Sequence, residues 1–242
     1  KTIVTSSTYR QAATFTHEKL EADPLNKLLS RGPRYRLDAE QIRDLALSSS
    51  GLLINKLGGP SVKPYQPSKI WESVAMKSSN TKNYKQDTGD KLYRRSLYTF
   101  WKRTAPNPSM EILNAPSRGI SCVRRERTNT PLQAFVIMND PQFVESSRQL
   151  AANALENHTD TPSRLQFIAK QLLNRELNNK ETVIVSKTLH FTHDKFKAAP
   201  EKAKELIAFG ESKAPDDIDP SELASWTIIA NQILNMDETL NK

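Results

Sequence analysis

Two histidines stand three residues apart in a segment of helical character. His190 and His193 would meet on one face of a helix, which is a spacing that metal ligands use. No third ligand with a suitable spacing is evident, and Asp194 beside them adds weak support. A solvated helix surface is therefore the favoured interpretation, and the sequence predicts no metal site.

The single cysteine, Cys122, lies among arginines that would favour its thiolate form. A nucleophilic cysteine also needs a base, and no histidine lies near it in the sequence. We therefore expect Cys122 to be a buried structural thiol. A lone cysteine also excludes an internal disulfide, a CxxC zinc site and covalent haem attachment through CxxCH.

Motifs that would identify an enzyme are missing from the sequence. It contains neither GxSxG nor HExxH, and neither GxGxxG nor GxxxxGK[ST]. The catalytic residues, if there are any, are unknown at this stage, and no cofactor is expected in this chain. No apolar run approaches the roughly 18 residues of a membrane span, so no membrane span is expected.

Basic charge is the strongest chemical feature, and it is concentrated in one segment. The net charge is +8 over 242 residues. Residues 91–127 hold nine basic and two acidic groups, which gives +7, whereas residues 200–242 carry −5. Basic residues interleaved with aromatic ones suit a nucleic-acid strand, an anionic glycan, a membrane surface or an acidic protein. Because no nucleic-acid-binding motif accompanies them, no nucleic acid is expected as a partner. The favoured alternative is that several arginines pair with the chain's own acids or donate to backbone carbonyls.

One candidate site nevertheless lies in this segment. Our hypothesis is that its arginines converge near an aromatic side chain and form an anion-binding or interdomain docking surface. The members of this candidate site are Arg94, Arg95, Trp101, Arg124, Arg125 and Arg127.

Local signals predict the elements that would position these residues. Asp23-Pro24 followed by three leucines predicts a short helix with Asp23 as its cap. Asp38 with Gln41 forms a capping-box pattern and predicts a helix that stops before Gly51. Residues 78–90 are polar and predict a surface loop. The stretch Arg95-Ser-Leu-Tyr-Thr-Phe-Trp101 has the composition of a strand.

Helix-start signals become regular from Thr130 onward. Thr130-Pro131 with Gln133 combines an N-cap, a proline at the first helical position and a capping box. A further helix is expected from Glu181 to about Ala198. The cap-plus-proline pattern recurs at three more sites, which are Asp140-Pro141, Thr161-Pro162 and Asp219-Pro220. Five helices joined by short linkers indicate a bundle.

The predicted fold class is mainly α, a multi-helix bundle with a small extended or β excursion around residues 60–125. We expect a single domain over residues 1–242, with an irregular basic segment at 57–127 and a helical bundle at 130–242. The chain begins without Met, signal peptide or helix cap. We therefore expect it to be the C-terminal fragment of a larger protein that lacks the first part of this domain.

Six stretches together resemble a known family. They are Thr5-Ser-Ser-Thr-Tyr-Arg-Gln11, Arg36-Leu-Asp-Ala-Glu-Gln-Ile-Arg-Asp44, Gly58-Gly59-Pro60-Ser61, Arg94-Arg95-Ser96-Leu97-Tyr98, residues 118–134 and Leu234-Asn235-Met236-Asp237-Glu238. Their order is similar to that of the planctomycete-specific domain of unknown function found C-terminal in cytochrome c-associated exported proteins, the "PSD one" family. The similarity covers essentially the whole chain.

This resemblance implies export to the periplasm or cell surface and companion domains in the same polypeptide. Any haem would belong to one of those separate domains. The resemblance implies no reaction. It also draws attention to Asn114, which stands where relatives usually place an Asp before the proline. If that Asp had a catalytic or ligand role, this chain has lost its charge.

The leading functional hypothesis is a non-catalytic interaction module. It would dock on companion domains or bind an anionic ligand such as an acidic or sulfated polysaccharide. The alternative is part of a polysaccharide-acting hydrolase or redox-linked enzyme whose active site is completed by upstream residues. The substrate and the oligomeric state lie beyond the sequence.

Overall fold

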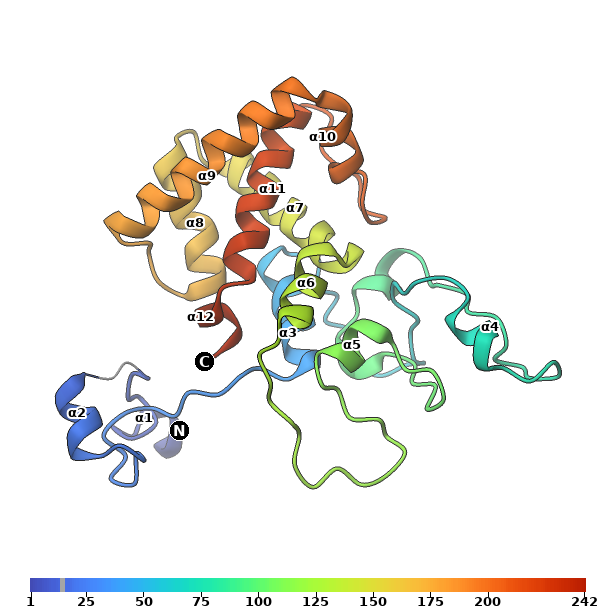
Figure 1. The fold of residues 1–242 in the computed structure, drawn as a ribbon, viewed down its shortest axis with the longest axis horizontal. Coiled ribbons are helices and arrows are strands. Elements are labelled where there is room, and N and C mark those ends of the chain that lie inside the picture. The colour runs from blue at the N-terminus through green and yellow to red at the C-terminus, as the bar shows by residue number, and fades with distance from the viewer. Residues whose placement is uncertain (14–15) are drawn as a thin grey trace.

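The computed structural model describes residues 1–13 and 16–242. Within these residues the chain forms twelve α-helices, two short 3-10 helices and three isolated β-bridges (Figure 1). The expected mainly α, multi-helix fold class is confirmed. The extended excursion is limited to single bridges between coil segments, and no sheet forms among the described residues.

The N-terminal segment lies beside the main body, at the lower left of Figure 1. It contains α1 (Thr2–Thr5) and α2 (His17–Ala22), and every residue of these two described helices is at the surface. The segment joins the body where the backbone N–H groups of Tyr35 and Leu37 donate to the carbonyls of Lys242 and Leu240, both at 2.8 Å.

The prediction of a short helix after Asp23 is wrong. Asp23 ends α2 instead, and its carboxylate accepts from the backbone N–H groups of Lys27 and Leu28, both at 2.7 Å. These bonds hold a turn in which Asn26 and Leu29 have positive φ angles of 54° and 55°. Such backbone cannot continue a right-handed helix.

Helix α3 (Ala39–Ser49) forms as the capping box predicts, with reciprocal bonds between Asp38 and Gln41. It ends before Gly51, whose φ of +79° is the left-handed conformation that suits glycine after a helix. Its buried apolar residues are Ala39, Ile42, Ala46 and Leu47.

The segment between α3 and the bundle is irregular. It holds α4 (Ile70–Val74), η1 (Gly89–Tyr93), η2 (Ser96–Tyr98) and α5 (Pro108–Ile112). The prediction of a strand over residues 95–101 is wrong, because the backbone of Ser96–Tyr98 forms the 3-10 helix η2. The only ladder contact it makes within the described residues is the single bridge between Val62 and Thr99. A strand needs a neighbour that is paired along its length, and among the described residues only Val62 pairs with this stretch.

The C-terminal half is the helical bundle. Its seven helices are α6 (Pro131–Asn139), α7 (Pro141–Asn157), α8 (Thr161–Leu173), α9 (Asn179–Ala198), α10 (Pro200–Ile207), α11 (Pro220–Leu234) and α12 (Asp237–Leu240). Helix α11 lies at the centre and packs against α6 to α10, as Figure 1 shows. One apolar core extends from Ala39 in α3 to Leu240 in α12.

The N-caps at Thr130, Asp140 and Asp219 are confirmed, and each side chain accepts from a backbone N–H of its own first turn. Asp160, not Thr161, caps α8, which shifts that helix start by one residue. The sequence prediction also missed α10, whose N-cap Ala199 has no side chain that could signal it.

Candidate functional site

The candidate arginines divide into buried and exposed members. Arg94 is only 5% exposed. Its guanidinium donates to the carbonyl oxygens of Lys56, Gly58 and Pro60 at 2.5 to 3.0 Å and lies 3.8 Å above the ring of Tyr98. Arg94 therefore holds the 56–60 turn, and its burial removes it from any docking surface.

Arg95 and its neighbour are tied to α3 by one carboxylate. Arg95 Nε lies 3.5 Å from Asp44 Oδ2, and the backbone N–H of Ser96 donates to Asp44 Oδ1 at 2.7 Å. The Arg95 side chain is 46% exposed, so this pair is largely screened by water. Its contact with Asp44 fits the expectation that several of these arginines pair with the chain's own acids.

Ser96, which follows Arg95, is held by a buried arginine that the candidate site did not include. Arg43 in α3 donates to the carbonyls of Leu92 and Arg94, to Ser96 Oγ and to Gln142 Oε1, at 2.6 to 3.1 Å. Burial lowers the pKa of Arg43 to about 10, so it remains charged at neutral pH. Arg43 thereby connects α3, the 92–96 turns and α7.

Arg125 is anchored to the N-terminal end of α3. It forms a two-pronged bond with Glu40, at 2.6 and 3.3 Å, and lies 3.5 Å from Asp38. The hydrogen bonds to Glu40 are the main cause that raises the pKa of Arg125. A bidentate arginine–carboxylate pair fixes geometry as well as charge.

Residues 115–127, which we call the arginine loop, project from the body between α5 and α6 (Figure 1). The loop is closed at its base, where Asn114 Nδ2 and Gln133 Nε2 both donate to Thr128 Oγ1, at 2.7 and 3.0 Å. Asn114 has a φ of +65°, a conformation that asparagine tolerates better than most residues. The Asn114 side chain therefore helps to close the arginine loop.

The tip of the arginine loop carries both apolar and basic side chains. Ile120 and Val123 are 83% and 100% exposed. Arg124 is exposed and has no ion pair within the described residues, and Arg127 lies 5.0 Å above the ring of Tyr35. Residues 124–128 line an open hollow of about 800 Å³.

Trp101 is paired with a different arginine from those expected. The guanidinium of Arg118 lies 5.0 Å from its ring centre, and Trp101 Nε1 donates to the Ser117 carbonyl at 2.8 Å. These contacts attach the first part of the arginine loop to Trp101. The candidate residues thus form several separate contacts along the segment.

Cys122 is exposed, and the expectation of a buried structural thiol is wrong. Its Sγ lies 3.4 Å from the Arg124 carbonyl, within the arginine loop. Burial would require a covering element, and the loop projects away from the core. No signal in the local sequence distinguishes these two environments.

The histidine pair lies on the surface of α9. His190 Nδ1 is 2.7 Å from the Ser186 carbonyl, one turn back along the helix. Among residues 1–13 and 16–242, no group of three His, Cys, Asp or Glu side chains is arranged to hold a metal ion. Nor does any helix there have the length and apolar character needed to cross a membrane.

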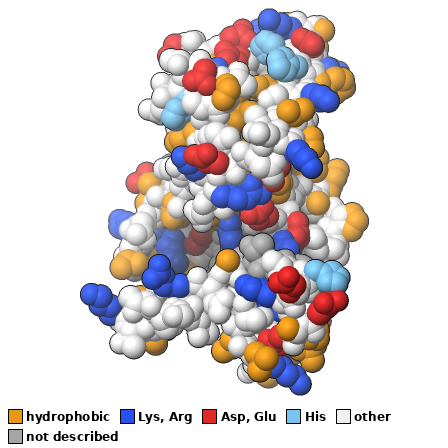
Figure 2. Space-filling model, turned by 90° about the vertical axis from the view of Figure 1, so that its left-hand side faces the viewer, with side chains coloured by type: hydrophobic (Ala, Val, Ile, Leu, Met, Phe, Trp, Pro, Cys, Tyr) orange, Lys and Arg blue, Asp and Glu red, His pale blue; other side chains and the backbone are white. Residues whose placement is uncertain are grey.

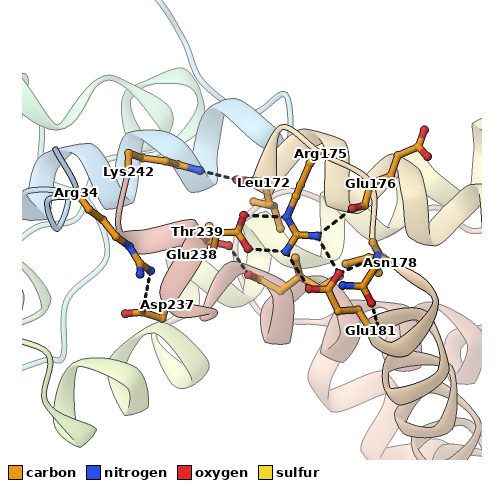
Figure 3. Close-up of polar contacts among 12 residues, drawn as sticks. Arg34, Leu172, Arg175, Glu176, Asn178, Glu181, Asp237, Glu238, Thr239 and Lys242 are labelled. Atoms are coloured by element: carbon orange, nitrogen blue, oxygen red, sulfur yellow. Dashed lines mark hydrogen bonds and ion pairs between the residues drawn. The ribbon is translucent and has the colours of Figure 1, made fainter. Parts of the chain in front are cut away.

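A cluster of charges around Arg175 was not foreseen from the sequence (Figure 3). Arg175 donates to both carboxylate oxygens of Glu181 and to both of Glu238, at 2.5 to 2.9 Å. These bonds join the start of α9 to α12 and raise the pKa of Arg175, while they lower the pKa values of both glutamates. Figure 3 also shows Arg34 reaching Asp237 from the N-terminal segment.

A second unforeseen cluster lies inside the bundle around Glu145 in α7. This carboxylate is fully buried and accepts from Tyr93 Oη and from the Ser212 backbone N–H, both at 2.7 Å. Arg148, one turn on, donates to the carbonyls of Ile207 and Ser212. Burial, together with the bond to Glu145, raises the pKa of Tyr93 to about 12. The cluster attaches the loop after α10 to α7.

Mixed charge also covers the face of the molecule drawn in Figure 2. Blue lysine and arginine side chains lie among red aspartate and glutamate side chains, and neither sign forms a continuous field there. The net charge of +8 therefore does not appear as a continuous basic surface on this face. A candidate anion-binding surface is better sought at the exposed arginines of the arginine loop.

The family-like stretches are in contact with one another. Arg43 and Asp44 of the α3 stretch bind the 94–98 stretch, and Arg94 of that stretch binds the Gly58–Pro60 turn. Residues far apart in the sequence thus form one structural frame beneath the arginine loop.

Comparison with known proteins gives a family without an assigned activity. A family model described as PSD1, a protein of unknown function (DUF1553), matches residues 1–189. No curated protein and no solved structure matches the chain.

Proposed function

The chain belongs to the PSD1 family of proteins of unknown function, and from that premise we propose that it is a non-catalytic interaction module which binds an anionic partner through its arginine loop. The family membership is the one that the six sequence stretches predicted. The partner in this proposal is an acidic surface of a companion domain or an acidic polysaccharide.

The observation that carries the proposal is the construction of the arginine loop. Its base is closed by Asn114 and Thr128, and Arg125 anchors it to Glu40. A loop held at these points presents Ile120, Val123 and Arg124 to solvent on one projecting segment. Exposed apolar side chains beside an unpaired cation are typical of a surface that a partner covers.

The proposal uses fewer arginines than the sequence suggested. Arg124 and Arg127 bind the partner, Arg125 positions the loop, and Arg94 and Arg95 stabilise the frame beneath it. In this proposal the module is part of an exported bacterial protein, and any haem resides in a companion domain.

The test measures affinity for dextran sulfate, a sulfated polysaccharide, by calorimetry over a series of salt concentrations. The double variant Arg124→Glu/Arg127→Glu should bind at least tenfold more weakly than the unmodified chain, because it replaces two cations in the hollow by two anions. The affinity of the unmodified chain should fall as salt rises.

The matched control is Lys187→Glu/Lys202→Glu, which makes the same change in net charge at exposed positions of α9 and α10. We expect it to weaken binding less than threefold. Equal losses for the two double variants would mean that net charge alone governs binding, and the proposed role of the arginine loop would be rejected.

A further inference from the structure

The backbone of the arginine loop has no backbone partners in the part of the chain that the structure describes. Residues 118–127 lie outside every helix and bridge there, and none of their N–H or C=O groups bonds to another backbone group. The bonds that these groups make are local. The Gly119 N–H donates to Ser117 Oγ at 3.3 Å, and Cys122 Sγ donates to the Arg124 carbonyl at 3.4 Å. Unpaired backbone at a surface is a template to which a second chain can add as a strand.

Two aliphatic side chains lie uncovered on this backbone. Ile120 is 83% exposed and Val123 is 100% exposed, and both are residue types that favour strands. The sequence has no proline between Pro116 and Pro131, so every amide of this stretch can donate a hydrogen bond. A partner that removes the two aliphatic side chains from water gains free energy from their burial.

Cationic side chains follow the aliphatic pair directly. Arg124 is exposed and has no ion pair within the described residues, whereas Arg125 is occupied by Glu40. Arg124 and Arg127 both line the open hollow of about 800 Å³ formed by residues 124–128, in which Glu126 is the one acid among the described residues. The charge of this surface is therefore complementary to a segment with acidic side chains.

The aliphatic pair distinguishes between the two anionic partners named above. A sulfated polysaccharide offers charged and hydroxyl groups, so it would pair with Arg124 and leave Ile120 and Val123 in water. A protein segment offers carboxylates, aliphatic side chains and a backbone that can pair with the loop. Trp101 and Tyr35 each have a guanidinium 5.0 Å from the ring centre, which covers a ring face that a sugar would otherwise use. These features favour a protein partner.

We propose that the arginine loop binds an extended acidic segment of a companion domain, which adds to the loop as a strand and covers Ile120 and Val123 with aliphatic side chains. Its carboxylates pair with Arg124 and Arg127. This inference rests on the proposed function, because it names the partner of the same loop. Backbone pairing supplies affinity, and the charged and aliphatic side chains supply specificity.

The test compares three end-blocked heptapeptides by calorimetry with the full chain. The first, Glu-Val-Glu-Ile-Glu-Val-Glu, alternates acidic and aliphatic residues. The second has serine in place of each aliphatic residue and keeps the same charge. The third has the side chains of the first, but N-methyl groups on its inner residues remove their N–H donors. The first peptide should bind about tenfold more tightly than either of the others.

Amide hydrogen exchange gives a structural readout of the same complex. Amides of residues 119–127 should exchange about tenfold more slowly when the first peptide is bound, because strand pairing occupies their N–H groups. The N-methylated peptide should leave their exchange rates unchanged.

A pair of double variants tests the aliphatic contact. Ile120→Ser/Val123→Ser should reduce the preference for the first peptide over the serine peptide to less than about twofold. The matched control is Val183→Ser/Ile184→Ser, which removes the same two residue types from α9, where they are 54% and 61% exposed. It should keep the tenfold preference.

Three outcomes would overturn this inference, which are equal binding of the three peptides, unchanged exchange in the loop, or equal effects of the two serine variants. If dextran sulfate still binds through Arg124 and Arg127, the proposed function stands and the partner is a polysaccharide. If neither dextran sulfate nor any of the peptides binds, the proposed function is rejected together with this inference.

Discussion

Arg43, Arg94 and Arg148 are almost completely buried, and all three donate to backbone carbonyl groups. Carbonyls at turns and helix ends have no partner within their own element, and a buried guanidinium can satisfy several of them at once. These side chains therefore organise irregular backbone. Removing any one of them would leave several buried carbonyls unpaired, which is a larger loss than a single surface ion pair.

At the residue scale, Gly210 provides the sharpest test of the buried Glu145 cluster. It has a φ of +89°, and a Cβ added there would overlap the Glu145 side chain. Gly210→Ala should lower the free energy of unfolding by more than about 2 kcal/mol, because the carboxylate is fixed by its hydrogen bonds and cannot move aside. Urea denaturation measures this loss.

The matched control is Gly89→Ala. Gly89 also has a positive φ, of +58°, and open space surrounds its Cβ position. The free energy of unfolding of the Gly89→Ala variant should fall by only about 1 kcal/mol, which is the cost of the left-handed conformation for alanine. Equal losses at Gly89 and Gly210 would show that backbone conformation alone accounts for both effects and that the contact with Glu145 is unimportant.

Among the elements, α3 is the one that connects the irregular half of the chain to the bundle. Its buried face packs in the core, while Asp38, Glu40 and Asp44 receive cations or N–H groups from the 94–125 region. The capping box that starts this helix therefore also orients the carboxylates that anchor the arginine loop.

At the element scale, Arg175 joins α9 to α12, and Arg175→Met should destabilise the chain by about 1 kcal/mol at pH 7. The estimate is modest because the Arg175 side chain is 36% exposed and solvent screens its bonds. Hydrogen exchange should show the largest loss of protection in α12. Chemical denaturation measures the total change in the free energy of unfolding.

The effect of Arg175→Met should depend on pH in a defined direction. Arg175 lowers the pKa values of Glu181 and Glu238 below their ordinary value of 4.5. Carboxyls with lowered pKa values in the folded state stabilise it above that pH, and they lose this contribution as pH falls through the folded values. The difference between the variant and the unmodified chain should therefore shrink below about pH 4.5.

Lys170→Met serves as the control for this pair of measurements, because Lys170 and Glu176 form an ion pair with side chains 59% and 62% exposed. We expect a smaller loss of stability than for Arg175→Met, because solvent screens this exposed pair. A difference at Arg175 that stays constant from pH 7 to pH 3 would contradict the role assigned to its glutamates.

Across the whole molecule, the described residues differ in how firmly they are held. The core from α3 to α12 is continuous, whereas α1, α2 and the tip of the arginine loop bury little. Segments with few buried contacts open at low cost. The surface that partners would meet is therefore carried by parts that depend least on the core.

Limited digestion with trypsin tests this division. We expect the first cuts at basic residues before position 35 and at Arg118, Arg124 or Arg127, followed much later by cuts within the bundle. Mass spectrometry of the fragments identifies the order. A first cut inside α9 or α11 would contradict it, because both helices are part of the continuous core.

Much of the helical architecture follows from the sequence alone. Asp38, Thr130, Asp140 and Asp219 cap helices where the sequence places them. These signals are local, since a cap and the N–H group that it satisfies lie within three residues of each other. The errors at residues 23–29 and 95–101 arose where side chains such as Asp23 and Asp44 took up backbone N–H groups that a helix or a sheet would otherwise use.

The chemical environment of the charged residues was decided only by the tertiary structure. The sequence identified Arg94, Arg95, Arg124, Arg125 and Arg127 as a basic group, but it could not show that Arg94 is buried or that Arg125 meets Glu40, 85 residues away. The cluster around Glu145 likewise joins residues from distant segments, because Tyr93 and Ser212 both donate to this carboxylate. Helix starts depend on neighbours in the chain, whereas charge pairing and cavities depend on which segments the core brings together.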